Sequence, residues 1–582
     1  MTTAIAVLPT RRTGSLALDP KPVLLALYLA IDWRAVAERI GSLGVSVELG
    51  AFLALYGLLA IALAAAAYVP GHAGRLALAT LFAAASLFLH GYEWATASPL
   101  DYNAFETMLA SRGDTGSAFA QHGAVMLQAG ATALLLFTAL ALPPRRRGLP
   151  LALHWLLPLA AVAGLGGMLY LRGGEGARAL PAAFAPVSEA GIKGWLLLTD
   201  DARPRNPVRF APVRPPAARD IVFVVDESVA AEYLDINSPR GVHSGLQAAR
   251  PGLQVVNYGV AASVTNVSAG SNKTLRFGGT RENYRDVGRF EASIWAYARA
   301  AGMRTVYLDG QRFGGELQNL MTPAERAEID DFVQLGSTPV VERDQVLARL
   351  LAERLANDVA EFIYVNKIGA HFPVADKFPE AAARYRPLPA RGATDAVIDM
   401  GPIHGSHHGT ADEWRLYRNA YRNTLIWNTG GFFDTLLPQI DPSRAVILYT
   451  SDHGQDLHER GNPGKGTHGT NDPLPEEGAV PLVVIDSAAA PRLDWQAHAA
   501  ANRDGMSHFR IFPTLLALLG FAENDVAPLY GPSLVSPRGE EPSFTINYFA
   551  LLGREPTWRR IDPATLAQPP ASDTVQVAMR GR

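Results

Sequence analysis

Cysteine is absent from this 582-residue chain, so its core must hold without disulfide bonds. A strong excess of charge is missing too: the formal net charge is −3, which argues against a general affinity for nucleic acid. The mean hydropathy of +0.06 is high for a soluble enzyme. We therefore expect a chain that is part membrane and part globular.

The apolar residues are concentrated before residue 172. Four stretches there approach or exceed the roughly 20 residues that a helix needs to cross a bilayer. They run over Val45–Val69, Leu76–Tyr92, Ala124–Leu142 and Leu151–Leu171. A shorter run, Pro22–Trp33, is either a fifth span or else an interfacial helix or an uncleaved signal-like segment. The sequence thus predicts an N-terminal transmembrane domain of four or five helices over residues 1–171.

Three consecutive arginines predict the orientation of these spans. Arg145, Arg146 and Arg147 lie in the short loop between the last two spans, and the positive-inside rule places such a loop in the cytoplasm. Everything after Leu171 is then outside the cytoplasm. The choice between four and five spans changes only the side on which the N-terminus lies.

Acidic and imidazole side chains follow two of the predicted strands. Asp226-Glu227-Ser228 comes directly after the run Ile221–Val225, and Ser451-Asp452-His453-Gly454 comes directly after the run Ala445–Thr450. Because open α/β folds keep their sites at the carboxyl edge of the sheet, we expect the two strand ends to converge. Glu227, Asp452 and His453 would suit Zn²⁺ or Mn²⁺ with an open fourth position, as in a catalytic site.

The segment Ser268–Leu275, between those strands, is small, polar and contains glycine, so it could bring a hydroxyl group close to the metal. A metal-bound hydroxyl loses its proton more easily and becomes a nucleophile. We predict that Thr274 is this nucleophile, although Ser268 and Ser271 lie close by.

In their order, these motifs resemble those of the membrane-bound phosphoethanolamine and phosphoglycerol transferases of the alkaline phosphatase and sulfatase superfamily, from about Asp220 to about Gly520. The resemblance implies an α/β alkaline phosphatase-like catalytic domain. It also implies a metal site of Glu227, Thr274, Asp452 and His453. Asn272-Lys273-Thr274 is similar to the Gly-Lys-Thr of lipoteichoic acid synthases.

Two further histidines match positions where that family keeps groups that face the substrate. His371 follows the run Phe362–Asn366, and His468 lies in Lys465–Thr470. The resemblance implies that both face the phosphoryl group, where they would neutralise transition-state charge and protonate the leaving alkoxide.

The predicted organisation is a transmembrane domain over 1–171, a Pro- and Arg-rich linker over 172–219, a catalytic domain over 220–540 and a C-terminal extension over 541–582. The Arg side chains of the linker would suit anionic headgroups. Departures from the family pattern, namely Gln455 in place of Glu and Asn428-Thr429 in place of Thr-Asp, bear on substrate choice.

The predicted function is metal-dependent transfer of a phospholipid headgroup, phosphoethanolamine above all, through a covalent phospho-Thr intermediate. The donor is a membrane phospholipid and the acceptor an envelope lipid or glycan. The protein would act as a monomer in the inner membrane, with its catalytic domain in the periplasm.

Several alternatives stay open on sequence alone. The headgroup could be phosphoglycerol, or the protein could be a phosphodiesterase or phosphatase that passes the intermediate to water. Sulfate-ester hydrolysis would need a Cys/Ser-x-Pro-x-Arg segment, and Ser238-Pro239-Arg240 has the wrong spacing. A catalytically inactive binding module is disfavoured because all four metal-site residues are present.

Overall fold

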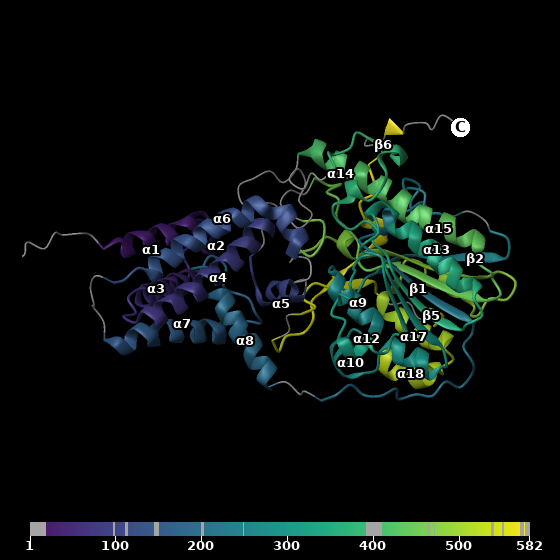
Figure 1. Ribbon diagram of the computed structural model, residues 1–582, viewed down its shortest axis with the longest axis horizontal. Helices are drawn as coiled ribbons and strands as arrows, with labels where there is room; N and C mark the ends of the chain where they lie inside the picture. Colours follow the sequence, from purple (N-terminus) through teal and green to yellow (C-terminus); the bar gives the residue numbers. More distant parts are fainter. Residues whose placement is uncertain are drawn as a thin grey trace, which may run out of the picture. The chain divides into compact units, whose positions relative to one another are not determined.

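A computed structural model of the chain contains two compact units (Figure 1). The first comprises Met1–His90, Leu127–Leu169 and Gly176–Trp195, and the second comprises Gly91–Met126, Tyr170–Glu175 and Leu196–Arg582. The structure describes residues 19–96, 99–110, 115–144, 150–199, 203–247, 250–391, 410–461, 466–470, 472–536, 541–549, 552–570 and 575–576. Arg145, Arg146 and Arg147 lie outside these residues.

The first unit is helical. Its helices are α1 (Pro20–Ile31), α2 (Trp33–Leu43), α3 (Val47–Ala67), most of α4 (His72–Thr96), most of α6 (Thr115–Ala141), most of α7 (Leu151–Leu171) and most of α8 (Ala185–Thr199). Four helices are long and apolar enough to cross a membrane, over Val47–Ala67, His72–Ala95, His122–Ala141 and Ala152–Leu171. The four predicted spans are therefore confirmed as helices of sufficient length and composition.

The fifth predicted run, Pro22–Trp33, forms a shorter element. Helix α1 has 12 residues, about 18 Å of rise, which by itself falls short of a hydrocarbon core about 30 Å thick. After Asp32 the chain continues as α2, which has no buried residue.

Two polar side chains of the first unit, Lys21 and Asp32, are paired with backbone or with another side chain. The Lys21 ammonium donates to the carbonyl oxygens of Ala67 and Ala139, at 2.6 and 2.8 Å. At the break between α1 and α2, an Asp32 carboxylate oxygen lies 3.0 Å from His90 Nε2. Such pairing is needed where no water is present to satisfy polar groups.

The second unit is built on a mixed eight-stranded sheet with the order β4-β3-β5-β1-β7-β8-β2-β9. Its strands are β1 (Asp220–Asp226), β2 (Leu253–Ala262), β3 (Arg304–Asp309), β4 (Asp331–Gln334), β5 (Glu361–Asn366), β7 (Ala445–Ser451), β8 (Ala479–Ser487) and β9 (Met506–Ser507). The central strand β1 is parallel to β5 on one side and to β7 on the other. The strands predicted from the two apolar runs are thus neighbours.

Both faces of this sheet are covered by helices, which explains why β1 is apolar without interruption. Val222 and Val224 belong to one buried core, whereas Ile221, Phe223 and Val225 belong to the other. The first core is completed by α13 (Arg343–Ala356), α14 (Ala411–Thr424) and α15 (Gly431–Leu436), and the second by α9 (Ser268–Phe277), α11 (Ile294–Ala300), α17 (Ile511–Leu518) and α18 (Glu523–Tyr530) (Figure 1). The remaining α-helices and strands are α5 (Tyr102–Ala110), α10 (Tyr284–Phe290), α12 (Pro323–Arg326), α16 (Trp495–Asn502), β6 (Tyr385–Arg386), β10 (Ser543–Thr545), β11 (Trp558–Arg560) and β12 (Val575–Gln576).

The Arg-rich linker packs on the α/β domain. The Arg205 guanidinium lies 3.9 Å from the Phe277 ring centre and donates to the backbone oxygens of Gly288 and Glu291. Arg209 pairs with the Glu291 carboxylate. These two arginines therefore hold the linker in place, a use that the sequence analysis, with its emphasis on anionic headgroups, did not foresee.

Residues after 540 also pack on this domain. Strand β10 pairs with β11, and the Thr545 amide donates to the Val264 carbonyl oxygen at 2.8 Å. Phe544 is fully buried in a small core with residues of β2 and β8. The first residues of the predicted C-terminal extension are thus packed against the core of the second unit.

Candidate metal and nucleophile site

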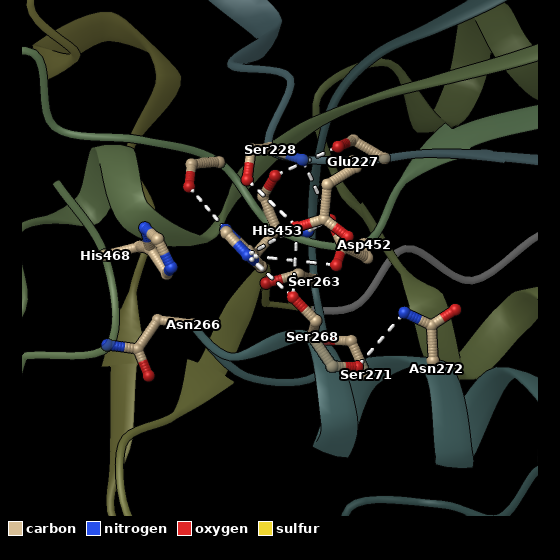
Figure 2. Close-up of polar contacts among 12 residues, drawn as sticks. Glu227, Ser228, Ser263, Asn266, Ser268, Ser271, Asn272, Asp452, His453 and His468 are labelled. Carbon is tan, nitrogen blue, oxygen red and sulfur yellow. Dashed lines mark hydrogen bonds and ion pairs between the residues drawn. The ribbon is translucent and has the colours of Figure 1, made fainter. Parts of the chain in front are cut away.

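The ends of β1 and β7 lie side by side, as the sequence predicted. Asp226 pairs with Ser451 in the strand register, and the Asp452 amide donates to the Asp226 carbonyl oxygen at 2.9 Å. Beyond this point Glu227, Asp452 and His453 each present one possible ligand atom. The three atoms lie within 4.8 Å of one another, and all three residues are buried (Figure 2).

Hydrogen bonds orient the three side chains toward a common point. His453 Nδ1 lies 2.8 Å from the Gly454 carbonyl oxygen, so Nε2 faces Glu227, whose Oε1 is 3.5 Å away. Asp452 Oδ1 accepts the amides of Ser228 and His453, at 3.0 and 2.8 Å. Such contacts are typical of the partners that orient metal ligands.

The second carboxylate oxygen of Asp452 shows whether the residues of the cluster fit a metal cation. Among the described residues, buried Oδ2 has no hydrogen-bond partner. A buried carboxylate oxygen without a partner is costly, and a cation is the group that satisfies it best. Two carboxylates and a neutral imidazole form a donor set that Zn²⁺ accepts. The residues present therefore fit a divalent metal ion.

The electrostatics of the cluster agree with this fit. Burial, together with the nearby Glu227 carboxylate, raises the pKa of Asp452 to about 7. The pKa of His453 is raised to about 10, because the Asp452 and Glu227 carboxylates outweigh the effect of burial. Burial alone would raise the pKa of Glu227, but its hydrogen bond to His453 and the neighbouring imidazoles hold it well below its usual range. The cluster thus favours a positive charge at its centre.

Of the hydroxyl groups in the segment Ser268–Leu275, that of Ser268 lies at this cluster and that of Thr274 does not. The Ser228 hydroxyl is also at the cluster, 3.0 Å from Glu227 Oε1. Ser268 is the first residue of α9, and its Oγ lies 3.1 Å from Glu227 Oε1 and 3.2 Å from His453 Nε2 (Figure 2). Thr274 lies six positions further along the same helix, about 9 Å of axial rise. Its hydroxyl is hydrogen-bonded to the Tyr548 hydroxyl at 3.1 Å. The structure therefore does not bring the Thr274 hydroxyl to the cluster of Glu227, Asp452 and His453.

The position of Thr274 has a local cause. The composition of Ser268–Leu275 predicts a loop, in which any hydroxyl could reach the metal. The segment forms a helix, so only its first turn meets the strand ends. The N-cap residue Val267 makes no side-chain cap. The first-turn amides, at the positive end of the helix dipole, are a suitable place for phosphate oxygens.

Both predicted histidines lie beside the cluster. The His468 ring stacks on the His453 ring with 4.4 Å between centroids (Figure 2). His371 follows a loop that is tied to the cluster because the Ala370 amide donates to the Glu227 carbonyl oxygen at 2.9 Å. Gly369 in this loop has φ +49°, and a Cβ there would overlap Asp226 and the Glu227 backbone. The catalytic roles of the two histidines remain predictions.

Three contacts of the strand end were not visible in the sequence. Asp226, next to Glu227, is neutralised by the buried Lys367 ammonium at 2.6 Å and also accepts from Thr429 Oγ1 at 2.9 Å. Gln311 Nε2 donates to Glu227 Oε2 at 3.1 Å. Neither Lys367 nor Gln311 lies in a recognisable motif. Only the adjacency of β3, β5 and β1 brings them to this edge.

Comparison with known proteins identifies the class to which this fold and site belong. The Sulfatase family model matches residues 219–521, just over half of the chain, and the chain belongs to that family. The match covers the whole interval from β1 to α17.

Within the family, the chain is similar to phosphoethanolamine transferases. It is 21% identical over 251 residues to Kdo(2)-lipid A phosphoethanolamine 7''-transferase of Escherichia coli (strain K12), covering 41% of this chain and 37% of the relative. It is 24% identical over 206 residues to the protein of the same name from Salmonella typhimurium (strain LT2), covering 32% of each chain. The chain therefore matches about a third of the length of these curated relatives.

The similarity in structure extends over more of the chain. The integral membrane protein lipooligosaccharide phosphoethanolamine transferase A from Neisseria meningitidis has a TM-score of 0.62 and 16% sequence identity. The match covers 88% of this chain and 98% of that protein. It shows the fold, an N-terminal membrane bundle followed by an alkaline phosphatase-like α/β domain.

Proposed function

We propose that this protein transfers phosphoethanolamine from a membrane phospholipid to an envelope lipid or glycan, with Ser268 as the nucleophile. One observation carries the proposal: the Ser268 hydroxyl lies at the N-terminus of α9, within 3.2 Å of both Glu227 and His453. Similarity to proteins named phosphoethanolamine transferases supports the choice of headgroup.

The proposed reaction has two displacements. Ser268 Oγ forms a bond to the donor phosphorus, the bond to the diacylglycerol oxygen breaks, and diacylglycerol leaves after taking up a proton. The acceptor hydroxyl then attacks the phosphoserine ester, loses its proton and releases Ser268. His371 and His468 are the candidates to donate and accept these protons.

Glu227, Asp452 and His453 would hold the metal ion, Zn²⁺ or alternatively Mn²⁺. When bound, such an ion lowers the pKa of a neighbouring hydroxyl and neutralises negative charge on phosphoryl oxygens. The free amides of the first turn of α9 would add to this neutralisation. A two-step transfer suits a membrane, because donor and acceptor need not be bound together.

The proposed topology is multi-pass in the inner membrane, with the α/β domain in the periplasm, where envelope acceptors are found. The four candidate spans support it. A reporter fused after Leu171 should then be active only outside the cytoplasm. Activity of that fusion inside the cytoplasm would contradict the assignment.

The direct test is to trap the intermediate. The full-length protein in vesicles containing phosphatidylethanolamine, but no acceptor, should acquire a phosphoethanolamine adduct, mapped by mass spectrometry to the peptide that carries Ser268. Ser268→Ala should form none. A phosphoglycerol adduct from phosphatidylglycerol vesicles would select the alternative headgroup. Donor cleavage by Ser268→Ala, with no adduct on any residue, would support direct hydrolysis and contradict the proposal.

A further inference from the structure

The helix that presents Ser268 is held by a segment from the far end of the chain. This segment, residues 543–549, comprises β10 and the four residues after it, and we refer to it as the C-terminal strap. The Thr545 amide donates to the Val264 carbonyl oxygen at 2.8 Å, just before α9 in the chain. Thr545 also forms a parallel bridge with Thr265. The strap therefore runs beside the connection that leads into α9.

One residue of the strap, Tyr548, spans a full turn of α9. A Cβ at Gly270 would lie 2.9 Å from Tyr548 Cγ, so the ring rests against the bare backbone of that glycine. The hydroxyl reaches Thr274 Oγ1 at 3.1 Å. Residues four apart share one face of a helix, so the Tyr548 ring can contact Gly270 while its hydroxyl bonds to Thr274.

Tyr548 is itself held by neighbouring aromatic side chains. It is only 7% exposed, and its ring centre lies 5.2 Å from that of Tyr284 and 4.9 Å from that of Phe549. Burial raises the pKa of its hydroxyl to about 12, so the hydroxyl stays protonated at neutral pH. The contact with Thr274 is thus a lasting neutral hydrogen bond.

The strap has a second anchor, Asn103 of α5. Its Oδ1 accepts the Phe549 amide at 3.1 Å, and its Nδ2 donates to the Ile546 carbonyl oxygen at 3.4 Å. The bonded residues Ile546 and Phe549 precede and follow Tyr548 in the chain. Only a side-chain amide supplies a donor and an acceptor together in this way. Three segments distant in sequence therefore meet at Tyr548: α5, α9 and the strap.

We propose that Tyr548 and Asn103 are positioning residues for the Ser268 nucleophile. Tyr548 contacts Gly270 and Thr274, and in this way the two residues fix the position of the first turn of α9, with Ser268, relative to Glu227 and His453. The inference rests on the proposed role of Ser268. It also gives the buried Thr274 hydroxyl a role: its hydrogen bond to Tyr548 holds α9 in place, and it takes no part in the chemistry. A displacement of about 1 Å at a reacting atom is enough to slow catalysis about 100-fold.

Steady-state kinetics of the full-length protein test the proposal. Tyr548→Phe keeps the ring and removes the hydroxyl, and Thr274→Val removes the other partner. Each should lower kcat for transfer about tenfold while the KM for the phospholipid donor changes less than about twofold. The double variant should be no slower than either single variant, because both remove the same bond.

A matched control exists elsewhere in the same domain. The Tyr297 hydroxyl bonds to the Tyr530 hydroxyl at 3.0 Å, a buried contact of the same kind between α11 and α18. Tyr297→Phe should leave kcat within about twofold of the wild type. An equal fall in kcat for Tyr297→Phe, or additive effects of Tyr548→Phe and Thr274→Val, would overturn the proposal.

Hydrogen exchange separates this inference from the proposed reaction. In Asn103→Ala the amides of the strap and of the first turn of α9 should exchange faster, while those of α17 should not change. Asn103→Asp, which keeps the acceptor for Phe549, should restore part of the protection. Unchanged exchange in α9 would overturn the positioning role whatever the nucleophile is. Activity that survives in Ser268→Ala would instead overturn the proposed reaction, and the exchange result would still decide the role of the strap.

Discussion

Helix α9 carries two hydroxyl groups of similar chemistry in very different surroundings, one at its first residue and one in its second half. At the first residue, Ser268 faces a buried carboxylate and an imidazole, whereas six residues later Thr274 faces a tyrosine hydroxyl. Thr274 is buried, whereas Ser268 is partly buried. The difference is the set of elements that each end meets: strand ends β1 and β7 at one, and the C-terminal strap at the other. A hydroxyl becomes a candidate nucleophile through its neighbours, and its residue type alone does not decide this.

The largest expected effect comes from removing the hydroxyl of Ser268, compared with removing that of Thr274. Ser268→Ala should lower the rate of transfer by about 10³-fold or more, as expected when a covalent route is lost. Thr274→Val should stay within about tenfold of the wild type. Ser268→Thr, which keeps a hydroxyl at that position, should retain measurable transfer. Rate measurements in vesicles that contain donor and acceptor check this, and the reverse order of the two losses would restore Thr274 as the nucleophile.

The next effect concerns the metal ligands at the first end. Asp452→Asn should lower metal affinity by about 100-fold or more, since a site with three protein ligands cannot spare one. Zinc content after dialysis against a weak chelator measures this. Asp441→Asn, a change of an exposed acid, serves as the control. Full zinc occupancy in Asp452→Asn would contradict the assigned ligand set.

The affinity for the metal ion should depend on pH, because its predicted ligands must lose protons to bind it. The pKa of Asp452 in the metal-free protein is raised to about 7, mainly by burial. A raised carboxyl pKa stabilises the metal-free fold below about pH 4, and this contribution is lost as the pH rises through about 7. Metal binding needs the Asp452 carboxylate and also the neutral His453 imidazole, whose pKa is raised to about 10. Affinity should therefore fall by about tenfold per pH unit below about 10, and by up to about 100-fold per unit below about 7, where two protons are displaced.

Zinc titrations between pH 5.5 and 8 on the full-length protein would check this slope. Asp452→Asn should show a flatter dependence, because one titrating ligand is gone. An affinity that is constant over this range would contradict the raised pKa.

The smallest effect belongs to the second end. Thr274→Val and Tyr548→Phe should each lower the free energy of unfolding by about 1 kcal/mol, the usual net contribution of one buried neutral hydrogen bond. Thermal unfolding of the detergent-solubilised protein measures this. Thr107→Val, which removes a half-buried hydroxyl bonded only to its own helix, is the comparison. A loss above about 3 kcal/mol would indicate that Thr274 does more than fasten the helix.

Much of the architecture could be predicted from local patterns. The apolar runs before residue 172 predicted four spans, because helix length and hydropathy follow from the thickness of a bilayer. The runs before Asp226 and Ser451 predicted buried parallel strands, and the polar residues at their ends converge as expected. The cluster of Glu227, Asp452 and His453 could be predicted because these residues directly follow the ends of their strands.

The hydroxyl group that meets the strand ends could not be predicted in the same way. Ser268, Ser271 and Thr274 occur within seven residues of each other, and composition made that segment look like a loop. Which hydroxyl meets the strand ends depends on where α9 begins and how it is rotated. In α9, Gly270 and Thr274 contact Tyr548, which comes from a segment far along the chain and whose neighbours are bonded to Asn103.

The sequence by itself therefore determined the bundle, the sheet strands and three of the polar residues at their ends, because periodicity and adjacency are local properties. Tertiary structure alone decided that Ser268 joins those residues, that Lys367 neutralises Asp226, and that the strap closes over α9. The physical reason is that these contacts join residues 41 to 274 positions apart. Such pairings depend on packing of the whole domain, which no local pattern encodes.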